Sequence, residues 1–220
     1  MLEVKNVSKI YKKNTEEVKA IDSVSLEIFS GDFVSIIGPS GSGKSSLLLM
    51  LGGMLTPSLG KVFIDGESLY DLTPNEIASL RQKKIGFVFQ TFNLIPYLSS
   101  LQNVQVPLLL RGLGAKEQIE RAESLLKRVG LEDRMQHKPS ELSVGQQQRI
   151  ALARMLANDP SIILADEPTG NLDPEMSQTV MEFLTELNQE GRTIVMVTHD
   201  MKIAMQAKRR VVISKGGTIG

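Results

Sequence analysis

The sequence has 220 residues, of which 41% are hydrophobic, so it is long and apolar enough for one domain with a buried core and a sizeable insertion. Its 25 Lys and Arg balance its 25 Asp and Glu, and this neutrality gives no reason to expect nucleic acid as a partner. Cysteine is absent, which excludes a disulfide framework and any thiolate nucleophile or metal ligand.

The sequence predicts no membrane-spanning segment. Apolar runs such as Val106–Leu110 and Ile162–Ala165 are far shorter than the roughly 20 residues that a membrane helix needs. The first residues, Met1–Val7, lack the apolar stretch of a signal peptide. We therefore expect a cytoplasmic chain whose contact with a membrane, if it has one, comes through a partner.

The first 90 residues read mainly as strands. Apolar segments bounded by turn residues predict strands at Leu2–Val7, Val24–Ile28, Phe33–Ile37, Lys61–Asp65 and Ile85–Phe89. The third of these strands runs directly into a glycine-rich loop, and a helix follows the loop and ends at a Gly-Gly pair. We expect this helix at Ser45–Leu51.

The middle of the chain changes character. Residues 91–142 show helical patterning, most clearly at Lys116–Val129, and we expect loops at Pro96, Pro107 and Pro139. We interpret residues 91–142 as a helical subdomain inserted into an α/β body. The remainder predicts helices and strands in alternation, at Gln146–Leu156, Ser161–Ala165, Glu175–Asn188, Thr193–Val197 and Arg210–Ile213. Continuous apolar strands between helices favour a parallel sheet that is covered on both faces.

One motif identifies a phosphate-binding loop. Gly38-Pro-Ser-Gly-Ser-Gly43-Lys44-Ser45 matches the pattern G-x-x-x-x-G-K-S/T between a predicted strand and a predicted helix. The glycines let backbone N–H groups surround a phosphate, and the helix N-terminus adds a favourable dipole. Lys44 supplies a cation to the β- and γ-phosphates, and the Ser45 hydroxyl is a ligand for Mg²⁺. We therefore predict nucleotide contacts from Gly38, Pro39, Ser40, Gly41, Ser42, Gly43, Lys44, Ser45 and Ser46.

Two acids end a buried strand that should lie beside this loop. Asp166 suits a Mg²⁺ site, either as a direct ligand or through another ligand of the ion, and Glu167 suits a general base for the attacking water. Gln90 and His199 also follow apolar strands, so their side chains should emerge at the same edge of the sheet. We predict Gln90 as a catalytic residue and Mg²⁺ ligand, and His199 as a γ-phosphate contact.

The stretch Leu142-Ser143-Val144-Gly145-Gln146-Gln-Gln-Arg149 resembles the signature of ABC ATPases. Ser143 also reads as the N-cap of the helix that follows. The family pattern has glycine where this chain has Val144, and a β-branched side chain there requires ordinary backbone geometry. We expect the substitution to be tolerated because Ser143 and Gly145 are kept.

The resemblance covers essentially the whole chain, and it implies further roles. ABC ATPases bind MgATP between two copies arranged head to tail, which implies that Ser143, Gly145 and Gln146 contact the nucleotide of a second copy. Gly170-Asn-Leu-Asp173 corresponds to the D-loop, which gives Asp173 the same kind of contact. Tyr11 occupies the place of the aromatic residue that stacks on adenine. The implied fold is an α/β P-loop ATPase core with a mostly parallel sheet.

On this resemblance residues 1–220 form one ABC ATPase domain. We assign 1–90 and 143–220 to the core with an antiparallel N-terminal β subdomain, and 91–142 to the inserted helical subdomain. Finer motifs, such as Ala165-Asp-Glu-Pro-Thr-Gly-Asn-Leu-Asp173, resemble the group of lipoprotein-releasing and macrolide-export ATPases. That resemblance implies a separate integral-membrane permease as partner, export or extraction of lipoprotein, drug or peptide, and a location on the cytoplasmic face of the membrane.

Two other functions of ABC ATPases are alternatives. A cell-division ABC ATPase would transmit force through a permease-like partner without moving a solute. An ABC ATPase acting on ribosomes or DNA generally carries two cassettes or a long coiled-coil insertion, and a single short cassette argues against that class. The apolar segment Thr91–Leu101, with Pro96 and Tyr97, predicts part of a groove for the permease, and its alternative is ordinary packing beneath a loop.

Overall fold

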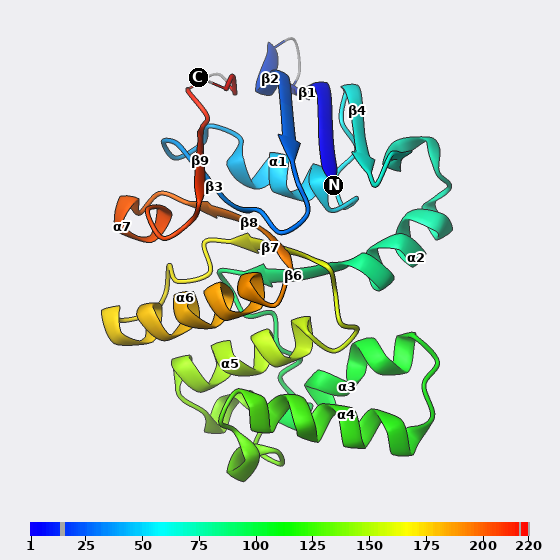
Figure 1. The fold of residues 1–220 in the computed structure, drawn as a ribbon, viewed down its shortest axis with the longest axis vertical. Helices are drawn as coiled ribbons and strands as arrows, with labels where there is room; N and C mark the ends of the chain where they lie inside the picture. The colour runs from blue at the N-terminus through cyan, green and yellow to red at the C-terminus, as the bar shows by residue number, and fades with distance from the viewer. Residues whose placement is uncertain (14–15, 216, 220) are drawn as a thin grey trace.

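A computed structural model describes residues 1–13, 16–215 and 217–219 (Figure 1). The N-terminal half contains β1 Leu2–Lys13, β2 Glu16–Ile28, β3 Phe33–Ile37, α1 Lys44–Leu51, β4 Leu59–Ile64, β5 Glu67–Ser68, α2 Pro74–Lys84, β6 Ile85–Phe89 and α3 Ser100–Leu110. The C-terminal half contains α4 Ala115–Arg128, α5 Val144–Met155, β7 Ile162–Asp166, α6 Pro174–Gln189, β8 Thr193–Thr198, α7 Met201–Ala204 and β9 Arg209–Val212. Short 3₁₀ turns lie at Leu69–Asp71, Glu132–Arg134 and Pro139–Glu141.

The predicted parallel sheet is confirmed, with the strand order β6-β7-β8-β3-β9. Its register aligns the C-terminal ends of these strands. Phe89 of β6 pairs with Asp166 of β7, Asp166 pairs with Val197 of β8, and Thr198 pairs with Ile37 of β3. The residues that leave β6, β7, β8 and β3 therefore emerge along one edge of the sheet, where ligands of α/β proteins bind.

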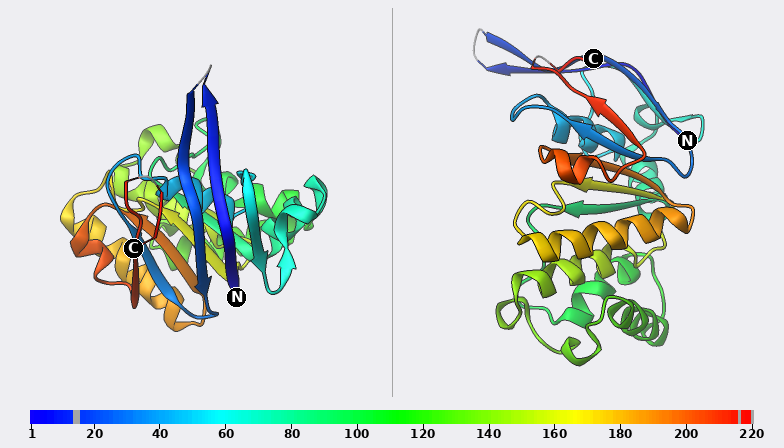
Figure 2. Two further views of the ribbon diagram at one scale, coloured as in Figure 1. Left: turned by 90° about the horizontal axis from the view of Figure 1, so that it is seen from above. Right: turned by 60° about the vertical axis from the view of Figure 1, so that its left-hand side comes forward.

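Alternate residues of each central strand enter two separate cores. In β7, Ile163 and Ala165 belong to one hydrophobic cluster, together with residues of α5 and α6, while Ile162 and Leu164 belong to the other, together with residues of α1. Figure 1 shows α1 on one side of the parallel sheet and α5 and α6 on the other. The right-hand view of Figure 2 shows the same sequence of layers from another direction.

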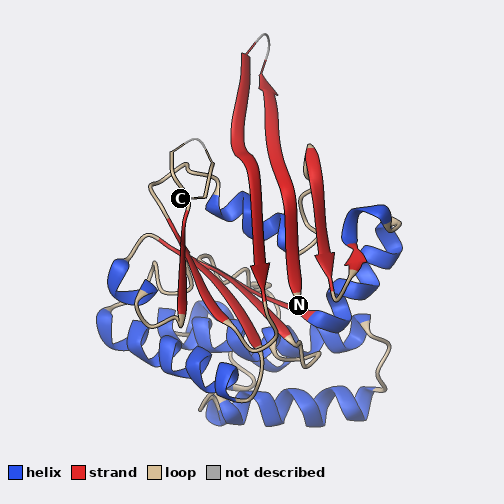
Figure 3. Cartoon of the chain, turned by 45° about the horizontal axis from the view of Figure 1, so that its top comes forward, coloured by secondary structure: helices blue, strands red, loops and turns tan. Residues whose placement is uncertain are grey.

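The N-terminal β subdomain is the antiparallel sheet β2-β1-β4-β5, as expected. Its first two strands are much longer than the predicted Leu2–Val7 and Val24–Ile28, and their hairpin projects beyond the body of the molecule (Figure 3). The alternation of apolar residues is interrupted where the register shifts, and Asn6 and Ser23 have the positive φ angles of 48° and 51° near those shifts. The apolar alternation therefore ends within the strands, and the predicted strands were too short.

Helices α2 and α3 differ from the sequence-based prediction. The polar segment before β6 forms α2, which begins with Pro74 at its first position and a capping box between Thr73 and Glu76. Pro107 was expected in a loop but lies inside α3. The capping box of Ser99 with Gln102 starts this helix, and the burial of Val104 and Leu108 continues it past the proline. Among the described residues, no helix is long and apolar enough to cross a bilayer.

The helical part consists of α3, α4 and α5, which contact one another. Asn103 of α3 is fully buried and organises the loop before this helix. Its side-chain nitrogen donates to the carbonyl oxygens of Ile95, Leu98 and Ser99 at 3.0–3.2 Å, and its oxygen accepts from the Ile95 N–H at 2.8 Å. One side chain thus fixes the backbone of the loop that carries Tyr97.

We expect Asn103→Ala to lower the free energy of unfolding by about 2–3 kcal/mol, because it leaves several backbone groups of residues 95–99 without their partner. Urea unfolding followed by circular dichroism measures the loss. Gln105→Ala, on the same helix and without a side-chain hydrogen bond among the described residues, is the matched control and should change stability by less than about 1 kcal/mol. Equal losses in the two variants would contradict the role of Asn103.

Candidate nucleotide site

The phosphate loop joins β3 to α1, and close contacts with its neighbours require its glycines. A Cβ on Gly38 would lie 2.2 Å from the carbonyl oxygen of Ile213, and a Cβ on Gly43 would lie 2.1 Å from that of Ala20. Gly43 also has a φ of 92° and is the N-cap of α1. No side chain caps this helix within the described chain, so its first N–H groups point into the loop, as an anion site requires.

Lys44 is folded into the loop that it serves. It is 7% exposed, and its Nζ donates to the carbonyl oxygens of Gly38 at 3.0 Å and Pro39 at 2.9 Å. Ser42 is buried as well, and Ser46 is partly buried. The remaining predicted ATP contacts of the loop, Pro39, Ser40, Gly41 and Ser45, lie on the surface. The loop therefore presents an exposed rim around one buried positive charge.

A hydroxyl and a carboxylate meet next to this loop. The Ser45 hydroxyl donates to Oδ1 of Asp166 at 2.9 Å, which joins the first turn of α1 to the end of β7. Burial raises the pKa of Asp166, the hydrogen bond from Ser45 opposes this shift, and the neighbouring charge of Glu167 adds to it. Two of the three predicted Mg²⁺ ligands, Ser45 and Asp166, are thus brought together.

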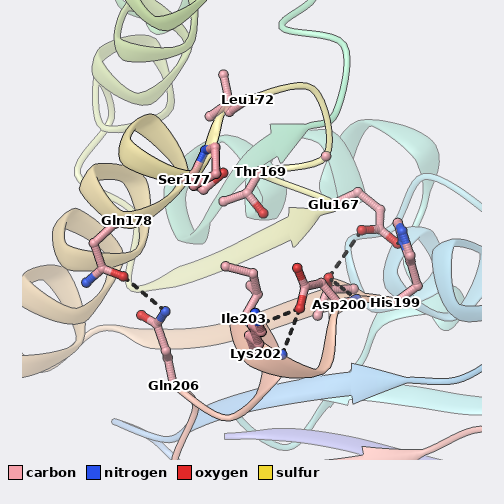
Figure 4. Close-up of a pocket in the computed structure, with 13 residues that line it drawn as sticks. Glu167, Thr169, Leu172, Ser177, Gln178, His199, Asp200, Lys202, Ile203 and Gln206 are labelled. Atoms are coloured by element: carbon pink, nitrogen blue, oxygen red, sulfur yellow. Dashed lines mark hydrogen bonds and ion pairs between the residues drawn. The ribbon is translucent and has the colours of Figure 1, made fainter.

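Glu167 is held by the next strand and by His199 (Figure 4). Its N–H donates to the carbonyl oxygen of Val197 at 2.9 Å, and its Oε2 accepts from the Thr198 hydroxyl at 3.2 Å. Its Oε1 lies 2.8 Å from Nδ1 of His199. The Glu167 side chain is only 16% exposed, whereas that of His199 is 69% exposed. The φ of Glu167 is 47°, a left-handed conformation that is uncommon for a residue with a side chain.

Gln90 contacts the D-loop. Its side-chain Nε2 lies 3.4 Å from Oδ1 of Asn171, and the Asn171 amide donates to the Gln90 carbonyl oxygen at 3.0 Å. Sequence reasoning placed Gln90 at this edge but missed Asn171, although it lies inside the segment that was identified as the D-loop. Thr198 was also missed. Nothing in the sequence tells which neighbouring side chain will face a residue at the end of a strand.

The signature residues start α5. Ser143 and Gln146 form a reciprocal capping box, and Val144 is a helical residue, 49% exposed, with ordinary backbone geometry as expected. A Cβ on Gly145 would lie 2.2 Å from Sδ of Met176, so α5 and the first turn of α6 approach closely there. Asp173 caps α6 by accepting from the N–H of Met176 at 2.9 Å. These residues come from helices on the opposite face of the sheet from α1 (Figure 1).

Tyr11 lies on the projecting hairpin. It is 44% exposed and pairs across the hairpin with Val18, and Nζ of Lys9 lies 5.3 Å from the centre of its ring. Two residues further along β2 is Ala20, whose carbonyl oxygen borders Gly43 of the phosphate loop. The hairpin therefore carries an exposed aromatic ring on the strand pair that borders the loop.

A profile of the ABC transporter family matches residues 21–170, so the chain belongs to this family. It is an ATP-binding subunit and an ATPase of that family, with the predicted α/β ABC ATPase fold. A dimeric structure of a post-hydrolysis state of the ATP-binding cassette MJ0796, bound to ADP and Pi, has a TM-score of 0.92 and 46% identity and covers 100% of this chain and 96% of that chain.

Two sequence relatives agree with this placement. The chain is 48% identical over 221 residues to the uncharacterized ABC transporter ATP-binding protein MJ0796 of Methanocaldococcus jannaschii, covering 98% of this chain and 94% of that protein. It is 47% identical over 219 residues to the macrolide export ATP-binding/permease protein MacB of Escherichia coli. That match covers 100% of this chain but only 34% of MacB. The resemblance to the macrolide-export group is thereby confirmed.

The raised pKa of Asp166 predicts a stability change when its charge is removed. The folded protein binds this proton more tightly than the unfolded chain, so the associated stability is present below the ordinary pKa and lost as the pH rises through the raised one. The ionised side chain is therefore destabilising at neutral pH. Asp166→Asn should raise the thermal midpoint at about pH 7, and the gain should shrink towards about pH 4.

Thermal unfolding across this pH range tests the prediction. Asp133→Asn is the matched control, because Asp133 is exposed and forms no ion pair with the described residues. Its midpoint should follow that of the wild type at every pH. An Asp166→Asn midpoint below that of the wild type at neutral pH would contradict the assigned cause of the shift.

Proposed function

We propose that this ATPase powers a separate integral-membrane permease on the cytoplasmic face of the membrane, for export or extraction of lipoprotein, drug or peptide. The observation that carries the proposal is the match to MacB, a protein named for both ATP binding and permease function. This chain aligns over its full length with only 34% of that protein. As part of this proposal, we assign the permease function to a second polypeptide.

A groove between α2, β6 and α3 supports a permease contact. It is a cavity of about 630 Å³ that is lined by Met54, Asn75, Ala78, Ser79, Arg81, Gln82, Ile85, Phe87, Phe89, Pro107, Leu110 and Asn158. The rings of Phe87 and Phe89 are stacked with their centres 5.4 Å apart, and Leu110 is 74% exposed at the rim. Exposed apolar surface beside a groove is typical of a protein-binding site.

The groove differs from the one expected at Thr91–Leu101. None of its lining residues belongs to that segment, although Tyr97 within the segment is 73% exposed. The proposed occupant is an apolar cytoplasmic segment of the permease, which would fill the groove and extend over Leu109 and Leu110. Both leucines are more than half exposed, at 63% and 74%.

Leu110→Glu should abolish capture of the permease, because it puts a charge at the apolar rim of the groove. The measurement is affinity capture from native membranes with tagged protein and MgATP, followed by mass spectrometry. Phe29→Glu is the matched control, since Phe29 is 52% exposed but lies at the turn between β2 and β3. It should capture the permease as the wild type does, and ATP hydrolysis without membranes should be unchanged in both variants.

Either of two results would contradict the proposal. Capture of ribosomes or nucleic acid without a membrane protein would remove the transporter role. Equal capture by Leu110→Glu and the wild type would remove the groove from the interface.

In the proposed cycle, two copies of the chain close on ATP. Tyr11 stacks on the adenine, and residues 38–46 hold the phosphates in the same copy. Ser143, Gly145, Gln146 and Asp173 of each copy contact the nucleotide of the other. Their location on elements across the sheet from α1 supports contact with a second copy, and the similar MJ0796 cassette is described as dimeric.

The described residues fit a Mg²⁺ ion that is shared with the nucleotide. The hydroxyl of Ser45 and the carboxylate of Asp166 provide adjacent oxygen atoms at 2.9 Å, and Gln90 lies at the same edge of the sheet. In the part of the chain that the structure describes, no three His, Asp or Glu side chains form a metal site of their own. Such a sparse set is typical of Mg²⁺, which takes its other ligands from phosphate and water, and a bound ion would neutralise phosphate charge.

Glu167 is the proposed general base. It takes a proton from the water that attacks the γ-phosphorus, and Thr198 and His199 hold its carboxylate in place. Nδ1 of His199 lies beside this carboxylate, and we assign the other ring nitrogen, Nε2, to the contact with the γ-phosphate. Lys44 contributes its charge to the same phosphate. Release of phosphate and ADP then opens the dimer and resets the cycle.

Glu167→Gln should lower the ATP hydrolysis rate by at least about a hundredfold and trap an ATP-bound dimer, because the amide cannot accept the proton of water. Hydrolysis assays and size-exclusion chromatography with MgATP measure the two effects. Glu123→Gln, at an exposed position of α4, makes the same chemical change and should retain the wild-type rate. A wild-type rate in Glu167→Gln would show that the base is another group.

A further inference from the structure

Helix α5 carries a buried polar side chain that the proposed mechanism does not use. Gln148, five residues after the Ser143 cap, is completely buried. Its Nε2 donates to the carbonyl oxygen of Pro168 at 2.8 Å, and its Oε1 is buried without a partner among the described residues. A buried amide oxygen without a partner is costly, so this glutamine is not explained by stability alone.

The contact of Gln148 lies directly beside the proposed general base. Pro168 follows Glu167, whose backbone has the left-handed φ of 47°. The turn is also restrained by the Gly170 N–H, which donates to the Glu167 carbonyl oxygen at 3.0 Å. Gln148 adds a restraint from helix α5, which lies outside this turn. Its bond holds the peptide that follows Pro168 and therefore limits movement of the turn in which Glu167 lies.

The far end of the same helix holds the segment after Gln90. Nη1 of Arg154 donates to the carbonyl oxygen of Asn93 and Nη2 donates to that of Phe92, both at 2.7 Å. Asn93 has a φ of 49°, which turns the chain sharply at this point. A planar guanidinium spans two adjacent carbonyls, which a lysine ammonium cannot reproduce. Burial lowers the pKa of Arg154, in agreement with a side chain enclosed between α5 and this turn.

We propose that Gln148 and Arg154 are positioning residues, through which the signature helix holds the turn of Glu167 and the segment of Gln90. The inference rests on the roles proposed above for those two residues. It makes α5 a rigid connection between the signature at its N-terminus, which contacts the nucleotide of the partner copy, and the hydrolytic groups of its own copy. Movement of the signature upon closure is then transmitted to both groups.

The first test replaces Gln148 by methionine, which fills a similar volume without the amide. The variant loses the bond to Pro168 but also loses the buried oxygen without a partner, so its thermal midpoint should stay within about 3 °C of the wild type. Its kcat should fall about tenfold, while KM for ATP changes less than about twofold. A purely structural residue would lower the midpoint without this division between kcat and KM.

Gln118→Met is the matched control on the neighbouring helix α4. The Gln118 amide likewise donates to a backbone carbonyl oxygen, that of Leu113 at 2.6 Å, at the start of α4 and outside the signature. The control variant should therefore keep the wild-type kcat. Equal kcat losses in the two variants would overturn the proposal, because they would assign the effect to the loss of any such bond in the helical part.

Arg154→Lys tests the second contact and remains informative if Gln148→Met fails to fold. The ammonium keeps the charge but loses the two-carbonyl geometry, so kcat should fall about tenfold with little change in KM. The Glu167→Gln variant distinguishes failure of the positioning role from failure of the general-base assignment. If Glu167→Gln is inactive while Gln148→Met and Arg154→Lys keep the wild-type kcat, the positioning role alone is overturned. If Glu167→Gln is active, the assignment of the general base is overturned.

Discussion

The common register of β6, β7, β8 and β3 is the constraint on which the whole nucleotide site depends. It places the residues that follow four strands along one edge, although they are separated by up to 161 residues between Gly38 and His199. A shift of one residue between β7 and β8 would move Glu167 away from His199 and turn alternate side chains to the wrong core. The apolar alternation of β7 between two clusters protects this register, so packing and chemistry are specified together.

The close approach of chain segments at glycine residues is the second constraint. A Cβ on Gly38, Gly43 or Gly145 would meet another atom at 2.1–2.2 Å, so each glycine lets two parts of the molecule approach closely. Gly38 and Gly43 lock the phosphate loop against the C-terminal segment and the hairpin. Gly145 brings the signature helix against α6, next to the D-loop. The same helix then reaches the two sides of the hydrolytic edge through Gln148 and Arg154.

Much of the fold could be read from local pattern. β3 and β6 were predicted with their observed bounds, because continuous apolar residues between turns leave little choice. The long hairpin and α2 were harder to predict, because residues such as Asn6 interrupt the alternation and only Leu80 of α2 is buried. The capping signal at Thr73 and Glu76 was present in the sequence and would have located α2. Pro107 was wrongly predicted in a loop, because burial of apolar side chains of α3 stabilises the helix more than the proline destabilises it.

The sequence by itself determined the family and the chemical types at the site, because motifs such as the phosphate loop require particular residues at fixed spacing. It also placed Gln90, Asp166, Glu167 and His199 at one edge, since parallel strands end together. Only the tertiary structure decided which atoms meet. That Glu167 faces His199, or that Gln148 reaches Pro168, depends on packing between elements distant in the chain. Such contacts are absent from any local pattern because no local interaction produces them.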